Sequence, residues 1–466
     1  MNNFRNNKAL WLSVVFALLT GSTAAAFGQT VKPLFQPLSV QTQSTPLPSP
    51  PPPSSSTPLV AKTGSSAAVG RKTSFSVLAD YEIPGYSGVL VEDLSGNTVL
   101  DSNSGLAFNP ASNVKIATAY AVIKTFGPEY RFATSVWTDG QLDAATGTLL
   151  GNLYVSGRDP VFNYEHAITI ANELNRAGVR NVSGDLIVTN NFVMNYSNSS
   201  DRAGALLAAT LDSAKRSVAA NRAWQSYLVN SKKYGTINGV PGVSFTGGVY
   251  VQTLPTNAKL LFAHESAPVK EIIKTTLCYS NNYLAEKLGD MLGGAYAVAR
   301  VVQLNAQVAP EEFLLQTSSG LGINRVTPRA MMKLLRAFRN ELARYKMTFG
   351  DVMPIAGIDP GTLQRRMNSF PQTGSVVGKT GTLGSTDGGA SALSGEMQTK
   401  QGKFLFVIFN QRGSNARFRI FQDSLVTVIQ NQLGGAVPMT YGGISLEERL
   451  ARTRITYPDT RARVNE

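Results

Sequence analysis

The chain has very little cysteine and histidine. Its 466 residues include one cysteine, Cys278, and two histidines, His166 and His264. A single cysteine cannot form a disulfide within the chain, and two histidines argue against a metal site built on imidazole ligands. They also argue against a Ser-His-Asp triad. We therefore expect no metal, and we also expect no cofactor.

Long apolar runs are also scarce, and the clearest one lies at the start of the chain. Arg5 and Lys8 precede the apolar residues 9–20, and small residues follow. This run is shorter than the ~20 residues that a membrane-spanning helix needs, so we predict a cleaved signal peptide over residues 1–28, with an uncleaved anchor as the alternative. A large exported chain without disulfides is typical of the bacterial periplasm or cell envelope. We therefore expect a secreted protein in that compartment.

Acidic residues are fewer than basic ones. The chain has 30 Asp and Glu against 43 Lys and Arg, which gives a formal net charge of +13. Nucleic acid is not an expected partner for an exported protein. Anionic wall polymers or a membrane surface are the expected partners if the charge serves binding, but we favour the plainer explanation of a charged, soluble surface.

Proline and serine divide the chain into parts. The stretch PLPSPPPPSSSTP is typical of an extended linker, and periodic strand and helix patterns begin near Phe75. Strands at both ends of the ordered region, with helices between them, predict an α+β fold with an antiparallel sheet and helices on its faces. The predicted parts are a signal peptide (1–28), a linker (29–74), a catalytic domain (75–130 and 265–436), an inserted domain (131–264) and a tail (437–466).

The first candidate for chemistry is Ser112 with Lys115, the only Ser-x-x-Lys pattern in the chain. Asn109 and Pro110 predict the start of a helix here, and Gly127 predicts its end. Residues three apart share one face of a helix, so the lysine can act as base for the serine. Taken alone, the pattern is also that of an ordinary helix start with an incidental lysine.

The second candidate is the triplet Lys-Thr-Gly, which occurs twice. The copy that begins at Lys62 lies in the predicted linker, where a catalytic lysine would have no fixed neighbours. The copy at Lys379, Thr380 and Gly381 is followed by Thr382 and reads as a strand. Small residues there let a substrate backbone approach, and threonine hydroxyls can bind a carboxylate. A strand followed by a glycine-rich turn is the structural alternative.

The third candidate is Ser280 with Asn282, between two predicted helices. A hydroxyl and an amide two positions apart suit a proton relay and a contact to a substrate amide. The pattern is weak, because Ser95 and Asn97 match it in a predicted turn. The order of the three motifs along the chain is more specific than any one of them. Such a trio occurs in penicillin-binding proteins and some β-lactamases.

On these residues the chain resembles the D-alanyl-D-alanine carboxypeptidase/endopeptidase family, the low-molecular-mass class C penicillin-binding proteins. PASNVK, SNNYLAEKL and GKTGTL are similar to its three motifs, and the long gap between the first two is similar to its inserted domain. The resemblance implies a β-lactamase/transpeptidase-like fold and a secreted serine peptidase that trims peptidoglycan stem peptides and is acylated by β-lactams. The resemblance implies that Ser112 is the nucleophile, that Lys115 is its base, and that Ser280 and Lys379 relay the proton. It also implies that Asn282 contacts a substrate amide and that the backbone N–H groups of Ser112 and Thr382 form the oxyanion hole. The substrate would lie along the strand of Thr380, Gly381 and Thr382.

The chain departs from the family pattern at a few positions. Asn281 stands where such trios usually have Asp, and the segment at Gln316 lacks the acidic residue often seen before Ser-Gly. Two alternatives to the carboxypeptidase are a β-lactamase or other penicillin-interactive hydrolase, and a catalytically inactive wall-binding protein. The intact serine and lysine motifs argue against the inactive protein, and the long insertion argues against the β-lactamase.

Overall fold

The computed structural model describes residues 71–237 and 239–458. The predicted signal peptide, almost all of the predicted linker and the first Lys-Thr-Gly at Lys62 lie outside these residues. Among the residues described, no helix combines the length and the hydropathy needed to cross a membrane.

The central sheet of the predicted catalytic domain joins an early and a late part of the chain. It has six strands in the order β1-β3-β2-β17-β16-β15, and every neighbouring pair is antiparallel. Its strands are β1 (Lys72–Thr73), β2 (Tyr86–Asp93), β3 (Thr98–Ser102), β15 (Val376–Leu383), β16 (Ala390–Thr399) and β17 (Gly402–Gln411). The early hairpin pairs with the late strands through β2 and β17. The predicted α+β class with an antiparallel sheet is confirmed.

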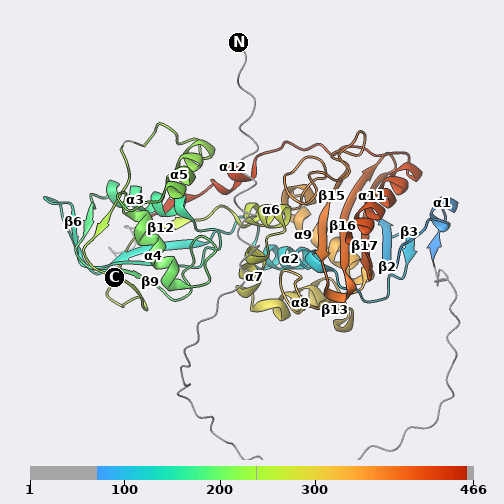
Figure 1. The fold of residues 1–466 in the computed structure, drawn as a ribbon, viewed down its shortest axis with the longest axis horizontal. Coiled ribbons are helices and arrows are strands. Elements are labelled where there is room, and N and C mark those ends of the chain that lie inside the picture. The colour runs from blue at the N-terminus through green and yellow to red at the C-terminus, as the bar shows by residue number, and fades with distance from the viewer. Residues whose placement is uncertain (1–70, 238, 459–466) are drawn as a thin grey trace, which may run out of the picture. The chain divides into compact units, whose positions relative to one another are not determined.

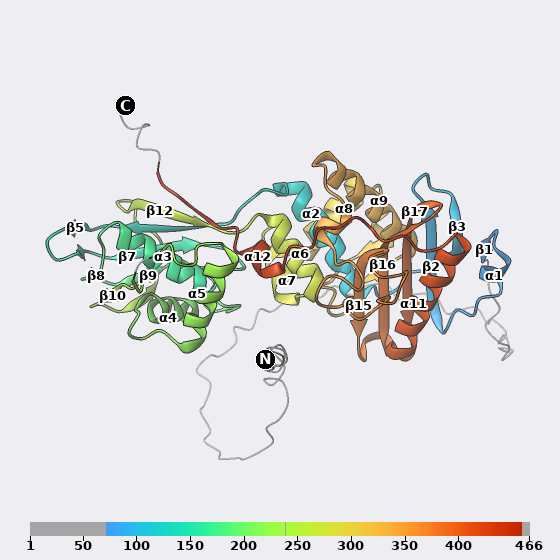
Figure 2. The same ribbon diagram turned by 90° about the horizontal axis from the view of Figure 1, so that it is seen from above.

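Both faces of this sheet are buried under helices. The alternating pattern of a strand sends Leu405, Val407 and Phe409 of β17 into one core and Phe404, Phe406 and Ile408 into another. Helices α2 (Val114–Phe126) and α9 (Pro328–Arg344) cover the first face, and α11 (Asn415–Gln432) covers the second (Figure 1). Figure 2 shows α9 and α11 on opposite sides of the strands.

The remaining elements of this domain are short or lie beside α2. They are α1 (Ser76–Ala79), η1 (Ala111–Asn113), α6 (Val269–Tyr279), α7 (Asn282–Asp290), α8 (Gly294–Asn305), η2 (Pro310–Glu312), β13 (Phe313–Leu314), β14 (Arg325–Val326), α10 (Phe349–Val352) and η3 (Thr386–Gly388). The apolar faces of α6, α8 and α9 share one core with α2, which explains why α2 is buried almost all round.

The inserted region has its own core and sheets. One sheet has the order β11-β9-β7-β4-β12-β18 and a second the order β10-β8-β6-β5. Its elements are β4 (Ala133–Thr138), β5 (Gln141–Asp143), β6 (Thr148–Leu150), β7 (Leu153–Gly157), α3 (Tyr164–Arg176), β8 (Asn181–Val182), β9 (Leu186–Val188), α4 (Ser200–Leu211), α5 (Val218–Asn230), β10 (Ser244–Phe245), β11 (Val249–Val251) and β12 (Lys259–Glu265). The stretch after Phe192, for which the sequence gives no assignment, contains α4 and α5.

The segment after Val437, predicted as a tail, carries regular structure up to Tyr457. It forms α12 (Leu446–Leu450) and β18 (Arg454–Thr456), and β18 pairs with β12 of the inserted sheet. Arg449 of this segment donates to the buried Glu271 of α6 at 2.7 Å. The end of the chain thus contacts both the catalytic helices and the inserted sheet.

Candidate active site

Ser112 lies in a short turn that precedes α2. The sequence predicts a helix from Pro110, but residues 111–113 form the 3-10 turn η1 and α2 begins only at Val114. The reason is the left-handed backbone of Ala111, with φ of 47°. The side chain of Asn109 accepts a hydrogen bond from Ala111 N at 3.1 Å, and the backbone N–H of Asn109 donates to Gln411 Oε1 at 2.7 Å. The serine is therefore presented on a firmly held turn.

Lys115 sits one helical turn after the serine and is 1% exposed. Its Nζ donates to Ser112 Oγ at 3.0 Å, to Asn282 Oδ1 at 2.7 Å and to the carbonyl of Ser319 at 2.6 Å. Burial lowers the pKa of Lys115 from 10.5 to about 7, while the nearby carboxylate of Glu286 acts in the opposite direction. A large fraction of this lysine is therefore neutral near pH 7 and able to accept a proton from the serine.

Glu286 is a residue of this site that the sequence reasoning missed. It accepts hydrogen bonds from the backbone N–H groups of Ser318 and Ser319, at 3.1 and 2.9 Å. These contacts hold the loop whose Ser319 carbonyl accepts from Lys115. Glu286 is four positions after Asn282 on α7, and this spacing on one helix face is the signal that could have identified it.

Ser280 occupies the junction between α6 and α7. Its backbone is left-handed, with φ of 56°, and it caps the end of α6. The next residue, Asn281, caps the start of α7, because its side chain accepts from Leu284 N at 3.0 Å. An Asn serves as a helix cap as well as an Asp does, which accounts physically for the departure at this position.

Lys379 reaches from β15 to the same junction. Its Nζ donates to Ser280 Oγ at 2.8 Å and to the carbonyl of Thr380 at 2.7 Å. The side chain is wholly buried, and burial, together with the charge of Lys115, lowers its pKa well below 10.5. The turn of Ser112 is tied to the same strand, because Asn113 Nδ2 donates to the Lys379 carbonyl at 3.0 Å.

Strand β15 is the last strand of the central sheet among the described residues. A side chain at Gly381 would place its Cβ 2.6 Å from the carbonyl oxygen of Pro110, so only glycine lets the strand pass this close to the turn of Ser112. Thr380 and Thr382 point to the same side of the strand, because side chains alternate along it. The structure therefore brings together all the residues predicted for the site, from α2, the α6–α7 junction and β15.

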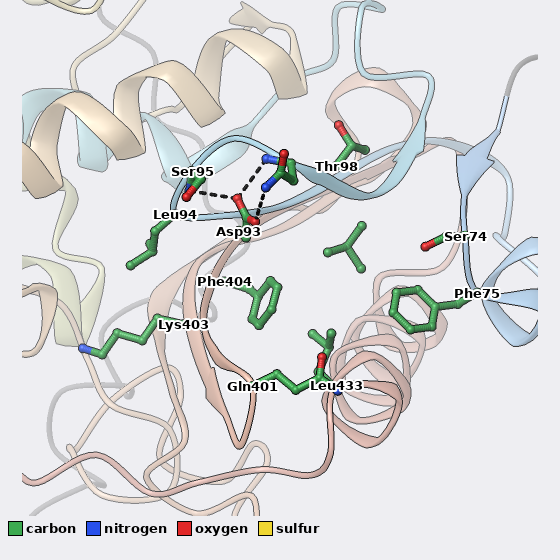
Figure 3. A pocket seen from close by; sticks show the side chains of 12 residues that line it. Ser74, Phe75, Asp93, Leu94, Ser95, Thr98, Gln401, Lys403, Phe404 and Leu433 are labelled. Atoms are coloured by element: carbon green, nitrogen blue, oxygen red, sulfur yellow. Dashed lines mark hydrogen bonds between the residues drawn. The ribbon is translucent and has the colours of Figure 1, made fainter.

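The weak Ser-x-Asn match at Ser95 and Asn97 lies elsewhere. Both line a cavity of about 480 Å³ near the β2–β3 turn, together with Phe75, Phe404 and Leu433. Figure 3 shows Asp93 in this turn hydrogen-bonded to its neighbours, and both Ser95 N and Asn97 N donate to its carboxylate at 2.8 Å. None of the residues predicted for the active site lines this cavity.

The two histidines lie in the inserted domain, away from the serine and the lysines. The rings of His166 and His264 are 4.8 Å apart and buried, and burial lowers the pKa of both. His166 accepts from Asn163 N at the start of α3, as part of a capping box. In the described part of the chain, no group of three or more His, Cys, Asp or Glu is placed to hold a metal ion.

Residues of the inserted domain contact Tyr283, the residue that follows Asn282 on α7. The hydroxyl of Tyr283 donates to the carbonyl of Ser197 at 3.2 Å, and its ring packs edge-on against Tyr196. In the same domain, burial raises the pKa of Asp159 and of Glu165 to about 7. The sequence reasoning identified neither carboxylate, because their positions depend on the fold of the insertion.

Comparisons with known proteins identify the family of the chain. The model of the D-Ala-D-Ala carboxypeptidase 3 (S13) family matches residues 75–205 and 231–432. A D-alanyl-D-alanine carboxypeptidase of Actinomadura sp. (strain R39) is 26% identical over 468 residues, with 78% of this chain and 85% of the relative covered. The D-alanyl-D-alanine carboxypeptidase DacB of Haemophilus influenzae is 30% identical over 185 residues, covering 36% of this chain and 37% of the relative.

Two solved structures share the fold. The predatory peptidoglycan endopeptidase Bd3459 of Bdellovibrio bacteriovorus is similar with a TM-score of 0.67 and 21% identity, covering 81% of this chain and 100% of the other. Penicillin-binding protein 4 of Haemophilus influenzae has a TM-score of 0.55 and 20% identity, covering 74% and 96%. At these identities the likeness shows the fold alone.

Proposed function

Because the chain belongs to the D-Ala-D-Ala carboxypeptidase 3 (S13) family and is a serine peptidase of that family, we propose that it trims peptidoglycan stem peptides through an acyl-enzyme on Ser112. The observation that carries the proposal is a pair of serine–lysine hydrogen bonds beside the edge strand β15. Lys115 Nζ lies 3.0 Å from Ser112 Oγ, and Lys379 Nζ lies 2.8 Å from Ser280 Oγ. Both lysines are buried, as a lysine that acts near neutral pH needs to be.

In the acylation step, neutral Lys115 accepts the proton of Ser112 Oγ as the oxygen attacks the carbonyl carbon of the penultimate D-Ala. The negative charge that develops on the carbonyl oxygen is stabilised by the backbone N–H groups of Ser112 and Thr382. The amide bond then breaks, and its nitrogen takes up the proton that Lys115 accepted, which leaves Lys115 neutral. We assign the relay of this proton to Ser280, whose hydroxyl is held by Lys379.

In the second step, water attacks the ester of Ser112. Lys115, neutral again, accepts a proton from the water, the shortened peptide leaves as a carboxylic acid, and the serine oxygen regains its proton. A β-lactam follows the first step in the same way but stays attached, because its opened ring remains in the site. A related structure of the Bdellovibrio endopeptidase was solved as the penicillin G-acylated protein, which supports the proposal for this chain.

The edge of β15 places the substrate. An extended peptide that pairs with residues 379–382 gains main-chain hydrogen bonds, and Gly381 keeps the backbone close to Ser112. Asn282, whose Oδ1 is held by Lys115, is placed to contact a substrate amide with its Nδ2. Thr380 and Thr382 receive the carboxylate of the leaving residue. No cofactor enters either step.

We further propose that the protein is secreted to the periplasm or cell envelope, which the signal-peptide pattern of residues 1–28 supports. Polymerised peptidoglycan lies outside the cytoplasmic membrane, so an enzyme that trims it has to be exported. Removal of Arg5 and Lys8 with the signal peptide lowers the net charge from +13 to about +11, and this remaining positive charge supports a weak association with anionic wall polymers or a membrane surface.

The test is a time course with a fluorescent penicillin on protein from Gln29 onward, with Ser112→Ala beside it. The proposal predicts a stable label on the wild type and none on the variant. Rapid loss of the label would favour a β-lactamase. Absence of label on both proteins would favour a wall-binding protein without activity.

A further inference from the structure

Asp387 connects parts of the active site that are distant in the chain. It belongs to η3, in the loop that joins β15 to β16. Its carboxylate accepts a hydrogen bond from Asn109 Nδ2 at 2.7 Å and from both terminal nitrogens of Arg325, at 3.0 and 2.8 Å. A paired contact between a guanidinium and a carboxylate fixes geometry better than a single hydrogen bond does. The β15–β16 loop is thereby attached to the segments that carry Asn109 and Arg325.

The carboxylate of Asp387 is not needed to close its own loop. Within the part of the chain that the structure describes, it accepts hydrogen bonds from Asn109 and Arg325 alone. The loop has backbone hydrogen bonds of its own, such as that from Gly388 N to the Ser385 carbonyl at 3.1 Å. The backbone of Asp387 is left-handed, with φ of 56°, which costs free energy in a residue other than glycine. A strained residue whose side chain serves other segments is a candidate for a role in function.

Asn109 connects Asp387 to the nucleophile. This wholly buried residue precedes the turn of Ser112, and its side-chain oxygen accepts from Ala111 N at 3.1 Å. Its Nδ2 donates both to Asp387 and to the carbonyl of Gly322, the latter at 2.9 Å. The oxygen and both hydrogens of the amide are therefore engaged, so the side chain is held in one orientation.

The turn of the nucleophile and the hairpin of β15 are joined by two side-chain hydrogen bonds. One runs from Asn113 Nδ2 to the Lys379 carbonyl at 3.0 Å. The other runs from Asn109 Nδ2 to the Asp387 carboxylate at 2.7 Å. In the chain, the nucleophilic serine lies between the two asparagines, and Thr382 lies between their two partners. One bond alone would let the two segments pivot against each other, whereas two bonds fix their relative orientation.

We propose that Asp387 is a positioning residue that sets the relative placement of the two backbone N–H groups of the oxyanion hole, those of Ser112 and Thr382. The inference rests on the proposed peptidase function, which assigns these two groups, and adds the residue that holds them in place. The groups come from different elements, so their aim at one oxygen depends on the contact between the turn and the hairpin. Such donors stabilise the developing charge only when they are placed in advance. Loss of the Asp387 carboxylate therefore slows acylation and leaves substrate binding intact.

The experiment follows acylation by a penicillin in stopped flow, with each rate constant expressed per active site, as titrated by the bound label. Asp387→Gly removes the carboxylate and suits the left-handed backbone. Asp387→Asn keeps an oxygen for Asn109 but loses the charge opposite Arg325. Ser385→Gly is the matched control, because it adds the same backbone freedom at an exposed position of the same loop.

A boronic acid analogue of N-acyl-D-alanine gives a second readout. Ser112 Oγ adds to its trigonal boron as the serine proton passes to Lys115, and one oxygen of the tetrahedral adduct takes the place of the carbonyl oxygen. The inhibition constant of this transition-state analogue therefore reports the oxyanion hole. The dissociation constant of the non-covalent penicillin complex, from the same stopped-flow series, reports binding alone.

We expect Asp387→Gly to lower the acylation rate constant about ten- to hundredfold, since loss of a whole oxyanion donor costs about 10²–10³-fold. Inhibition by the boronic acid should weaken by a similar factor, and the dissociation constant of the non-covalent complex should stay at its wild-type value. Asp387→Asn should recover part of the loss, and Ser385→Gly should behave as wild type.

Three results would overturn the positioning role while leaving the peptidase intact: wild-type acylation and inhibition in Asp387→Gly, a loss confined to non-covalent binding, or an equal loss in Ser385→Gly. If Asp387→Gly does not fold, the same readouts on Asp387→Asn decide. Failure of penicillin to acylate the wild type would overturn the proposed function as well.

Discussion

The side-chain nitrogen of Lys379 lies 2.8 Å from the hydroxyl of Ser280, although 99 positions separate the two residues in the chain. Lys379 comes from the edge strand β15 and Ser280 from the junction of α6 and α7. Their contact therefore depends on the way the helices pack against the sheet. It completes a site whose other pair, Ser112 and Lys115, is local to one helix start.

Replacing Ser280 by Ala should slow acylation without unfolding the protein. Lys379 would keep its contact with the Thr380 carbonyl, but the leaving nitrogen would lose its proton relay. General acid–base groups contribute about 10²–10⁴-fold, so we expect a loss in that range in stopped-flow acylation by a peptide substrate. Ser95→Ala, in the β2–β3 turn, is the matched control and should be acylated at the wild-type rate. Near wild-type rates for Ser280→Ala would contradict the relay.

The pH dependence of acylation should report Lys115. Burial lowers its pKa to about 7, and the neutral form is the base, so kcat/KM should rise with pH through about 7 and level off above it. Below this value the rate should fall about tenfold per pH unit, since only one proton is involved. A rising limb near the usual lysine value of 10.5, or a flat profile, would show that Lys115 is not the base.

Glu286 should act through Lys115. Its carboxylate raises the lysine pKa against the effect of burial, so Glu286→Gln should move the rising limb of the pH profile to lower pH. The amide also cannot accept from both Ser318 N and Ser319 N as the carboxylate does, which should cost about 1–3 kcal/mol of stability. Glu311→Gln, on the exposed turn η2, serves as control. If the rising limb of the pH profile lay at the same pH in Glu286→Gln as in the wild type, Glu286 would have a structural role only.

The C-terminal segment should stabilise the protein through a buried ion pair. Glu271 is 1% exposed and accepts from Arg449 at 2.7 Å and from Arg452 at 3.1 Å. Arg449→Met should leave part of this charge uncompensated and destabilise the protein by about 3 kcal/mol in urea unfolding. Lys270→Met breaks the more exposed pair with Glu129 and should cost less than about 1 kcal/mol. If Arg449→Met lost as little unfolding free energy as Lys270→Met, the C-terminal segment would add little to stability.

Asp159 should make the protein less stable as the pH rises. Burial raises the pKa of Asp159 in the folded protein to about 7 from its ordinary value of 3.8, so between these values the folded state holds a proton that the unfolded state has lost. Stability should therefore fall between about pH 4 and pH 7 and stay at the lower level above that window. Asp159→Asn, which keeps the shape without the charge, should raise Tm at pH 8 and change it little at pH 4. A larger rise in Tm at pH 4 than at pH 8 would contradict the burial of the carboxyl group.

The parts of the site that could be predicted are those that the chain encodes locally. The spacing of Ser112 and Lys115 on a helix, and the glycine between two threonines on a strand, follow from helix and strand geometry. The late start of α2 could not be predicted, because it depends on the left-handed Ala111, which packs against Gly320. A residue from another part of the chain decides that turn.

The partners that arrive from distant segments were missed for the same reason. The carbonyl of Ser319 and the carboxylates of Glu286 and Asp387 reach the site only after α2, α7 and β15 have packed together. The sequence after Val437 has no apolar run that would predict a strand, yet β18 pairs with β12 at the edge of the inserted sheet. Pairing with an existing edge needs backbone hydrogen bonds and little apolar surface.

The most direct measurement of the central claim is release of D-alanine from a pentapeptide that ends in D-Ala-D-Ala, with wild type, Ser112→Ala and Ser95→Ala at equal concentration. The samples are also treated with penicillin and digested, and the modified peptide is identified by mass spectrometry. The account predicts D-alanine from wild type and Ser95→Ala, none from Ser112→Ala, and the penicilloyl group on Ser112. Release of D-alanine by Ser112→Ala, or modification of another residue, would contradict it.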